Sequence, residues 1–302
     1  MNILVTGAEG LLGQDIVTEL QRRGHKTIGT YHIRKSSEPT SLQLDITDRN
    51  MVHNVIRQVK PDAVIHCAAW TAVDAAEDPQ NIPQVHAVNA GGTRNIAEAC
   101  QLTGCRMLYF STDYVFSGQG NQPWSADSTS FSPVNVYGQT KLEGEQAVTE
   151  LLSRYFILRV SWVFGVHGKN FVDTMLRLGK KQDVLQVVND QIGTPTYTRD
   201  LARLAVDMIE TEAYGIYHAT NEGGYISWYE FACEIFRQAG YETKVMPVST
   251  REYGCSKAAR PFNSRLDKSK LMQFGFQPLP HWQDALSRYL QEFKESLWEK
   301  ST

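Results

Sequence analysis

The stretch NILVT-GAEGLLG, residues 2–13, decides the fold of this chain. Its first five residues form an apolar run rich in branched side chains, which predicts a buried β-strand. Three glycines follow at Gly7, Gly10 and Gly13, and apolar residues then recur at helical spacing over residues 11–23. A strand, a glycine loop and a helix in this order are typical of a dinucleotide-binding site.

Each position of the glycine loop has a physical reason. The first glycine permits the tight turn, the second lets a pyrophosphate approach the backbone, and the third lets helix and strand pack closely. The helix N-terminus adds N–H donors and a positive potential. We therefore expect the cofactor phosphates to contact Gly7, Gly10, Leu11, Leu12 and Gly13.

The end of the second predicted strand, residues 26–31, indicates which cofactor is bound. An acidic residue there binds the ribose of NAD, whereas arginine accommodates the 2′-phosphate of NADP. The chain has His32-Ile33-Arg34-Lys35 and no acid. We predict that Arg34 binds the phosphate, so that NADP(H) is preferred and NAD(H) is possible; the alternative is a pair of solvated surface cations. Asp45 is expected either to accept from the adenine amino group or to cap a helix.

The same alternation continues along the first half of the chain. Further strands are predicted at residues 41–46, 62–69, 106–112 and 155–162, and helices at 48–60 (with Asp48 as a possible cap), 82–103 and 135–152. Strand–helix alternation with continuous apolar strands predicts an α/β fold with a doubly wound parallel sheet, Rossmann-type.

The second half is less regular and predicts a smaller α/β substrate-binding domain. It has glycine- and proline-rich loops and helical patterns near residues 199–211, 228–239 and 281–297. We expect an NADP(H)-binding domain over 1–165, with roughly 197–218 crossing back to it. The substrate domain is then expected over 166–196 and 219–302.

Composition excludes several classes of protein. The 302 residues carry a net charge of −3 with no basic segment, which argues against a nucleic-acid partner. No apolar run reaches the ~18 residues of a membrane span. The five cysteines are scattered and the eight histidines show no ligand spacing, so no metal site is expected. The start of the chain does not read as an export leader, and we expect a cytoplasmic protein.

Tyr137 and Lys141 lie four residues apart at the predicted start of the helix 135–152, so their side chains share one face. A tyrosine has a pKa of about 10, and a nearby ammonium should lower it toward the range of a general acid. The pair follows a strand that ends in Ser111-Thr112, where a hydroxyl is placed to bind a carbonyl oxygen. The pattern YxxxK also occurs by chance as an exposed helical pair.

Together these features resemble the extended short-chain dehydrogenase/reductase superfamily. The segment HAVNAGGTRNIAEAC, residues 86–100, resembles the superfamily helix in which an asparagine, here Asn89, supports the active-site backbone. Longer strings resemble one branch, the dTDP-4-dehydrorhamnose reductases, over nearly the whole chain. They are CAAWTAVDAAE (67–77), FSTDYVFSG (110–118), SPVNVYGQTKLEGE (132–145), LRVSWVFG (158–165), NDQIGTPT (189–196) and ARPFNSRLD (259–267).

The resemblance implies a role for individual residues. Tyr137 is the proton donor, Lys141 its partner, and Thr112 the hydroxyl that tunes the tyrosine and touches the substrate. The cofactor is expected to contact Ile46, Ala68, Ala69, Thr71, Asn89, Tyr137 and Lys141 as well. The substrate is expected to contact Val73, Thr112, Asp113, Tyr114, Trp162, Arg260 and Ser264, with help from Asn263.

Simpler interpretations of these residues remain open. Asp113 is also suited to capping a turn, Trp162 to the core, and Arg260 to pairing with a surface acid. The carboxylates Asp74, Glu77 and Asp78 are interpreted as a solvated helix start.

The implied activity is NADPH-dependent reduction of the C4 ketone of dTDP-4-dehydro-L-rhamnose, with a possible homodimer. One alternative is a nucleotide-sugar epimerase or dehydratase of the same fold. The Asp-Glu pair common after the active-site threonine of dehydratases is replaced here by Asp113-Tyr114. A second alternative is a non-catalytic subunit resembling the regulatory β subunit of methionine adenosyltransferase. The string SWVF favours the enzyme, because that regulatory subunit departs from the family at this string.

Overall fold

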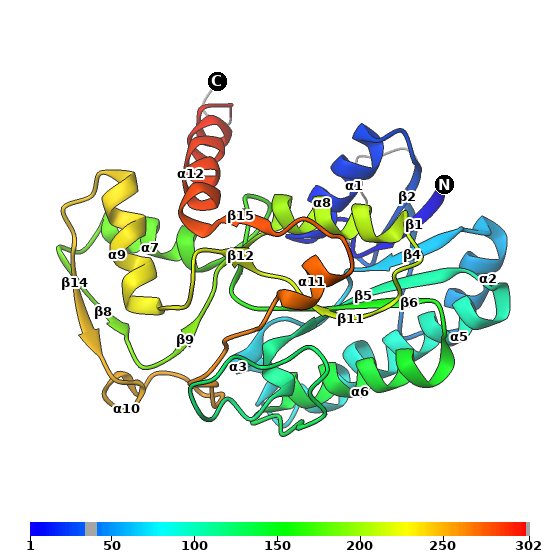
Figure 1. The fold of residues 1–302 in the computed structure, drawn as a ribbon, viewed down its shortest axis with the longest axis horizontal. Helices are drawn as coiled ribbons and strands as arrows, with labels where there is room; N and C mark the ends of the chain where they lie inside the picture. The colour runs from blue at the N-terminus through cyan, green and yellow to red at the C-terminus, as the bar shows by residue number, and fades with distance from the viewer. Residues whose placement is uncertain (34–40, 300–302) are drawn as a thin grey trace.

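A parallel sheet of seven strands forms the centre of the computed structural model, which describes residues 1–33 and 41–299, with side chains described through 295 (Figure 1). The strand order is β11-β6-β5-β4-β1-β2-β3. The strands are β1 (Asn2–Thr6), β2 (Lys26–Tyr31), β3 (Leu42–Gln43), β4 (Ala63–His66), β5 (Arg106–Thr112), β6 (Tyr155–Val160) and β11 (Gly215–His218). The order reverses between β1 and β4, so the predicted doubly wound fold is confirmed.

Helices cover both faces of this sheet. One face packs against α1 (Gly13–Arg22) and α8 (Thr198–Ile209), and the other against α2 (Arg49–Val59), α5 (Thr93–Thr103) and α6 (Val136–Leu151). The side chains of β1 divide between the two cores, with Ile3 and Val5 on one side and Leu4 on the other. Burial on both faces explains why the strands are continuously apolar rather than alternating.

The predicted helix over 82–103 is interrupted. The structure has α4 (Ile82–His86), a π-helical turn η1 (Ala87–Gly92) and then α5. A Cβ on Gly92 would lie 2.7 Å from the Ile46 side chain, so this turn packs closely against the loop that follows β3. Wide turns of this kind are frequent at functional sites, and this one carries Asn89.

The predicted strand over 41–46 is mostly wrong. Only Leu42 and Gln43 pair, at the edge of the sheet beside β2, and both are exposed. The chain then turns at Asp45, whose side chain bonds to Thr47 and ends the strand. The predicted cap of the next helix is confirmed, because the Asp48 side chain accepts from the backbone N–H of Met51.

The C-terminal helices and strands lie beside the sheet (Figure 1). They enclose a second core that is rich in aromatic residues. It is built from α7 (Phe171–Gly179), α9 (Trp228–Ala239), α12 (Trp282–Glu299) and the parallel pair β8 (Val184–Val188) and β14 (Lys244–Val248). Short elements complete the fold: α3 (Val73–Ala76), η2 (Asp113–Val115), β7 (Val163–Phe164), β9 (Ile192–Gly193), β10 (Thr196–Tyr197), β12 (Asn221–Glu222), β13 (Ile226–Ser227), α10 (Thr250–Tyr253), α11 (Ser269–Gln273) and β15 (Leu279–His281). Within the described residues, no helix combines the length and the apolar character that crossing a membrane requires.

Candidate active site

The glycine loop after β1 makes contacts that only glycine permits. Gly7 has a φ of +64°, and a Cβ on it would lie 2.8 Å from the backbone of Ala68. A Cβ on Gly13 would lie 2.1 Å from the carbonyl oxygen of Gly7, so the start of α1 rests directly on the loop. Gly10 is exposed, and Leu12 at the N-cap makes no side-chain cap bond. Open backbone and an uncapped helix start fit the pyrophosphate of a dinucleotide.

Asn89 braces the backbone that follows β4. Its Oδ1 accepts from the N–H of Trp70 at 2.8 Å, and its Nδ2 donates to the carbonyl oxygen of Trp70 at 3.2 Å. The same amide lies 3.2 Å from the Thr140 hydroxyl on α6. Asn89 therefore ties the segment beside the glycine loop to the helix that carries Tyr137.

The other residues expected to contact the cofactor differ in their burial and in their hydrogen-bond partners. Asp45 accepts from the N–H and the hydroxyl of Thr47 at 2.9 and 2.7 Å and does not cap α2. Ile46 is buried against Gly92, whereas Thr71 is exposed. Arg34 lies outside the described residues, so its contact with a 2′-phosphate stays a prediction.

Tyr137 and Thr112 are brought together by the close approach of α6 to the turn after β5. The Asn135 side chain caps α6 by accepting from the N–H of Gly138 at 2.7 Å. A Cβ on Gly138 would lie 2.3 Å from the Tyr114 carbonyl oxygen, so a larger residue would push the helix away. Burial raises the pKa of Tyr137 and the nearby Asp113 raises it further, while a hydrogen bond with Thr112 lowers it.

The expectation that Lys141 lowers the pKa of Tyr137 is wrong for this structure. Lys141 is buried one turn along α6, and its Nζ lies 4.1 Å from the centre of the Tyr109 ring. Burial lowers the pKa of Lys141 to about 7, against the opposite influence of Glu145. The Tyr137 phenol therefore holds its proton at neutral pH, which is the form a proton donor requires.

Lys141 also connects the two motifs found in the sequence. It lies close enough to Cys67 for each group to affect the other's pKa. Cys67 precedes Ala68, the residue against which Gly7 packs. The tyrosine–lysine pair and the glycine loop, more than 120 residues apart by the numbering, thus meet at the carboxyl ends of β1 and β4.

Asp113 is a buried carboxyl group beside the tyrosine. Its side chain accepts from the Thr112 hydroxyl at 3.1 Å, and its Oδ2 has no partner among the described residues. Burial raises the pKa of Asp113 to about 7, while hydrogen bonds from Ser264 and Thr112 lower it. A carboxyl that is partly protonated at neutral pH is suited both to accept from and to donate to a substrate hydroxyl.

Arg260 reaches this cluster from the C-terminal part of the chain. Its Nη1 donates to the Tyr114 hydroxyl at 3.3 Å, and the Tyr114 ring meets the Tyr137 ring edge-on with centroids 5.7 Å apart. Its Nη2 lies 2.6 Å from Asp74 Oδ2. The simpler interpretation, in which Arg260 pairs with an acid, is thus confirmed, with Asp74 as the acid.

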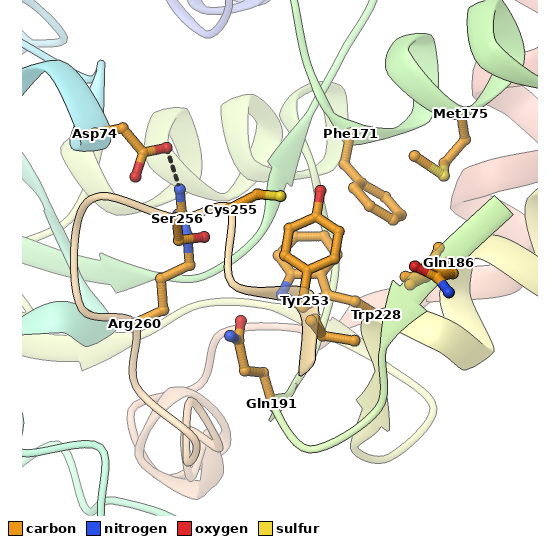
Figure 2. Close-up of a pocket in the computed structure, with 12 residues that line it drawn as sticks. Asp74, Phe171, Met175, Gln186, Gln191, Trp228, Tyr253, Cys255, Ser256 and Arg260 are labelled. Atoms are coloured by element: carbon orange, nitrogen blue, oxygen red, sulfur yellow. Dashed lines mark hydrogen bonds and ion pairs between the residues drawn. The ribbon is translucent and has the colours of Figure 1, made fainter. Parts of the chain in front are cut away.

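A cavity of about 380 Å³ opens beyond Arg260 (Figure 2). Figure 2 shows the Arg260 and Asp74 side chains at one side of this space, and Phe171 and Trp228 lying across from them. The lining residues are Asp74, Phe171, Met175, Gln186, Val187, Val188, Gln191, Trp228, Tyr253, Cys255, Ser256 and Arg260. Aromatic walls with a few polar groups and one cation are suited to a ligand with a flat base and an anionic linker.

Trp162 does not line this cavity, but it packs directly against a residue that does. Its indole stacks on Trp228 with centroids 3.7 Å apart, and its backbone has a φ of +49°. Gly193 fits between Trp162 and Ser264, since a Cβ there would lie 2.8 and 3.0 Å from them. Strained backbone at a residue other than glycine is a frequent mark of a functional site.

Comparison with known proteins agrees with this geometry. A family model described as the RmlD substrate binding domain matches residues 1–295. The chain belongs to the RmlD substrate-binding domain family. It is 41% identical to a dTDP-4-dehydrorhamnose reductase of Streptomyces griseus, over 94% of this chain and 91% of that protein. It is 38% identical to the spore coat polysaccharide biosynthesis protein SpsK of Bacillus subtilis, over 96% and 97%.

Solved structures of two dTDP-4-dehydrorhamnose reductases have the same fold. A dTDP-4-dehydrorhamnose reductase of Clostridium acetobutylicum superposes with a TM-score of 0.89 at 39% identity, covering 97% of this chain and all of that one. A second, from Bacillus anthracis in complex with NADP, gives a TM-score of 0.87 at 41% identity, covering 96% and 98%. The predicted resemblance to this branch is therefore confirmed.

Family membership does not by itself find every residue of the site. Sequence reasoning missed Phe171, Trp228 and Tyr253 at the cavity, because a lone aromatic at helical spacing predicts a core position equally well. Gln191 lies within the NDQIGTPT string, which was a usable signal. Val73 and Asn263 do not line the cavity, although Val73 precedes Asp74 directly and Asn263 precedes Ser264.

Proposed function

We propose that this protein catalyses the NADPH-dependent reduction of the C4 ketone of dTDP-4-dehydro-L-rhamnose, giving dTDP-L-rhamnose. The observation that carries the proposal is one continuous site. Lys141 lies near Cys67, next to the residue on which the glycine loop packs, and Tyr137 lies one turn before Lys141 on the same helix. Tyr114 and Arg260 extend this cluster to the cavity. A ketone at Tyr137 would then have its diphosphate near Arg260 and its base among the aromatic walls.

In this proposal the chain's own residues donate the proton and orient its donor. The neutral Tyr137 phenol donates its proton to the ketone oxygen as C4 becomes tetrahedral. Thr112 orients the phenol through their hydrogen bond. Lys141, one turn along α6, would contact the bound cofactor, as the family resemblance implies. NADPH, when bound, supplies the hydride that C4 receives, so the ketone gains two electrons and two hydrogens in total.

The cofactor would be held by groups already placed in the fold. The backbone of Gly7, Gly10 and Gly13 would bind its pyrophosphate, and Asn89 would keep the adjoining segment in place. NADP(H) is preferred and NAD(H) is possible. We expect Arg34→Ala to weaken NADPH binding much more than NADH binding; equal effects on the two would remove the phosphate role of Arg34.

The test is steady-state kinetics on dTDP-4-dehydro-L-rhamnose with each cofactor. One NADPH consumed per sugar reduced supports the proposal. Isomerised sugar with no net NADPH loss would indicate an epimerase instead. No turnover on any nucleotide sugar, together with capture of a synthetase partner, would indicate a regulatory subunit.

We extend the proposal to the division into domains, the oligomeric state and the cellular location. We propose that the sheet-containing part, 1–165 with roughly 197–218, binds the cofactor, and that 166–196 and 219–302 bind the nucleotide sugar; the separate aromatic core supports this division. A homodimer is tested by light scattering. Location in the cytoplasm is tested by cell fractionation, and the five free cysteines suit a reducing compartment.

A further inference from the structure

The acidic turn around α3 is not the solvated helix start that the sequence suggested. Each of its three carboxylates has a partner on a distant segment. Glu77 Oε1 accepts from the N–H of Val136 at 2.8 Å, at the start of the helix that carries Tyr137. Asp78 pairs with Lys257 on the surface. Asp74 pairs with Arg260, so this turn touches both the catalytic helix and the C-terminal loop.

Three bonds fix the guanidinium of Arg260, and Asp74 makes the one that joins opposite charges. Its Nε donates to the Ser256 hydroxyl at 3.2 Å, its Nη1 to Tyr114 at 3.3 Å and its Nη2 to Asp74 at 2.6 Å. In this arrangement one N–H on each terminal nitrogen is left over for a further acceptor. Figure 2 shows Arg260 extending along the wall of the cavity toward Asp74.

Asp74 also holds the backbone of the loop that carries Arg260. Its Oδ1 accepts from the N–H of Ala258 at 3.0 Å, while Oδ2 takes the guanidinium. One carboxylate therefore fixes both the loop and the end of its arginine. A half-exposed long side chain without such an anchor would sample several rotamers and would lose that freedom only on binding.

We propose that Asp74 is a positioning residue for substrate binding. It holds the Arg260 guanidinium at the cavity wall so that its remaining N–H groups meet the diphosphate of the nucleotide sugar. This inference rests on the proposed function for the identity of the ligand. Tyr114 lies between this guanidinium and Tyr137, so the cavity is next to the proton donor.

The opposite role for Asp74 would be competition, because its carboxylate occupies part of the fork that a diphosphate would use. Positioning predicts that loss of the charge weakens binding, whereas competition predicts that it strengthens binding. Asp74→Asn separates these, since the asparagine Oδ1 still accepts from the N–H of Ala258 and the loop stays tethered. The matched control is Asp78→Asn, which removes the same charge from the same turn, where the Asp78 side chain pairs with the exposed Lys257.

The experiment measures KM for dTDP-4-dehydro-L-rhamnose, kcat, and the Kd of dTDP by calorimetry. For Asp74→Asn we expect KM and the dTDP Kd to rise about tenfold, in line with one charge-assisted bond. We expect kcat and the NADPH Kd to change less than about twofold, and Asp78→Asn to change each constant less than about twofold. An unchanged or tighter dTDP Kd in Asp74→Asn would overturn the inference.

A double-mutant cycle shows whether Asp74 acts through Arg260. Arg260→Met should weaken dTDP binding more than Asp74→Asn does, and adding Asp74→Asn to it should change little further. Additive effects would contradict the positioning role. If the wild type binds dTDP but does not reduce the sugar, the proposed function fails while the dTDP cycle still decides the inference. If the wild type does not bind dTDP, both fail.

Discussion

The two ends of the site are built differently. At the catalytic end, Thr112, Asp113 and Lys141 are almost fully buried and stand on the core elements β5, η2 and α6. At the cavity end, Arg260, Asp74 and Tyr253 are half-buried or exposed and come from a loop and two short helices. Buried groups on core elements stay in place without a ligand, whereas exposed loop residues depend on a few polar contacts.

The difference indicates which part of the site requires precisely placed side chains. Proton transfer requires the donor within hydrogen-bond reach of the reacting oxygen, and small displacements are costly. A nucleotide offers a larger surface over which many weaker contacts add up. We therefore expect substitutions at the catalytic end to change the rate or the stability, and those at the cavity end to act on binding by smaller factors.

Tyr137→Phe should have the largest effect of all. Removing the proton donor is expected to lower kcat about 10³-fold, because positioned acids contribute about 10²- to 10⁴-fold. The aromatic ring and its edge contact with Tyr114 remain, so the NADPH Kd should be unchanged. Stopped-flow reduction and fluorescence titration give the two values. Near-normal turnover would remove Tyr137 from the chemistry and with it the contrast between the two ends.

The same division explains what the sequence could predict. The catalytic end could be predicted because its motifs are short stretches of sequence. The glycine loop Gly7–Gly13 directly follows β1, and Tyr137 and Lys141 are one helical turn apart. The Asp74–Arg260 pair joins residues 186 positions apart, and the sequence around either residue does not indicate that the two form a pair. Trp228 reaches the cavity only because α9 packs beside α7 in the second core.

One error and one omission at the catalytic end have a physical cause as well. The sequence places Lys141 one turn from Tyr137, but does not show that the ammonium lies over Tyr109. Nor does it show how completely Asp113 is buried, and burial is what raises its pKa. Spacing along a helix fixes which face a residue shares, whereas electrostatics depend on what packs against that face.

Glu145→Gln tests how strongly the catalytic helix is held. Glu145 on α6 forms a bidentate pair with the fully buried Arg159, at 2.9 and 2.7 Å. Removing one partner leaves a buried unpaired charge, which costs about 3–5 kcal/mol. The matched control on the same helix is Glu150→Gln, whose exposed pair with Arg94 should contribute less than about 1 kcal/mol. Urea unfolding measures both, and equal losses would mean that the buried pair has no special role.

Asp113→Asn should change how stability depends on pH. The pKa of Asp113 in the folded protein is about 7, above its ordinary value of 3.8, so the folded state binds more protons between these values. Stability of the wild type therefore has its Asp113 contribution in full below about pH 4 and loses it as pH rises through about 7. We expect the variant to lack this loss and to gain a few degrees in Tm relative to the wild type at pH 8. Thermal scans from pH 4 to 8 check this, and parallel curves for the two proteins would contradict it.

Cys255 reports on the cavity end and carries the smallest expected effect. It is exposed and lines the cavity, whereas Cys100 and Cys105 are buried, and Cys67 and Cys233 are half-buried and do not line the cavity. Alkylation by iodoacetamide should therefore modify Cys255 first, and dTDP at ten times its Kd should slow this about tenfold through occupancy alone. The rate at Cys233, followed by mass spectrometry in the same sample, is the internal control. Equal slowing at both cysteines would point to a global change, and no slowing at Cys255 would place the nucleotide outside this cavity. Either result would leave the binding end of the site undefined while the catalytic end stands, because the two are held by different contacts.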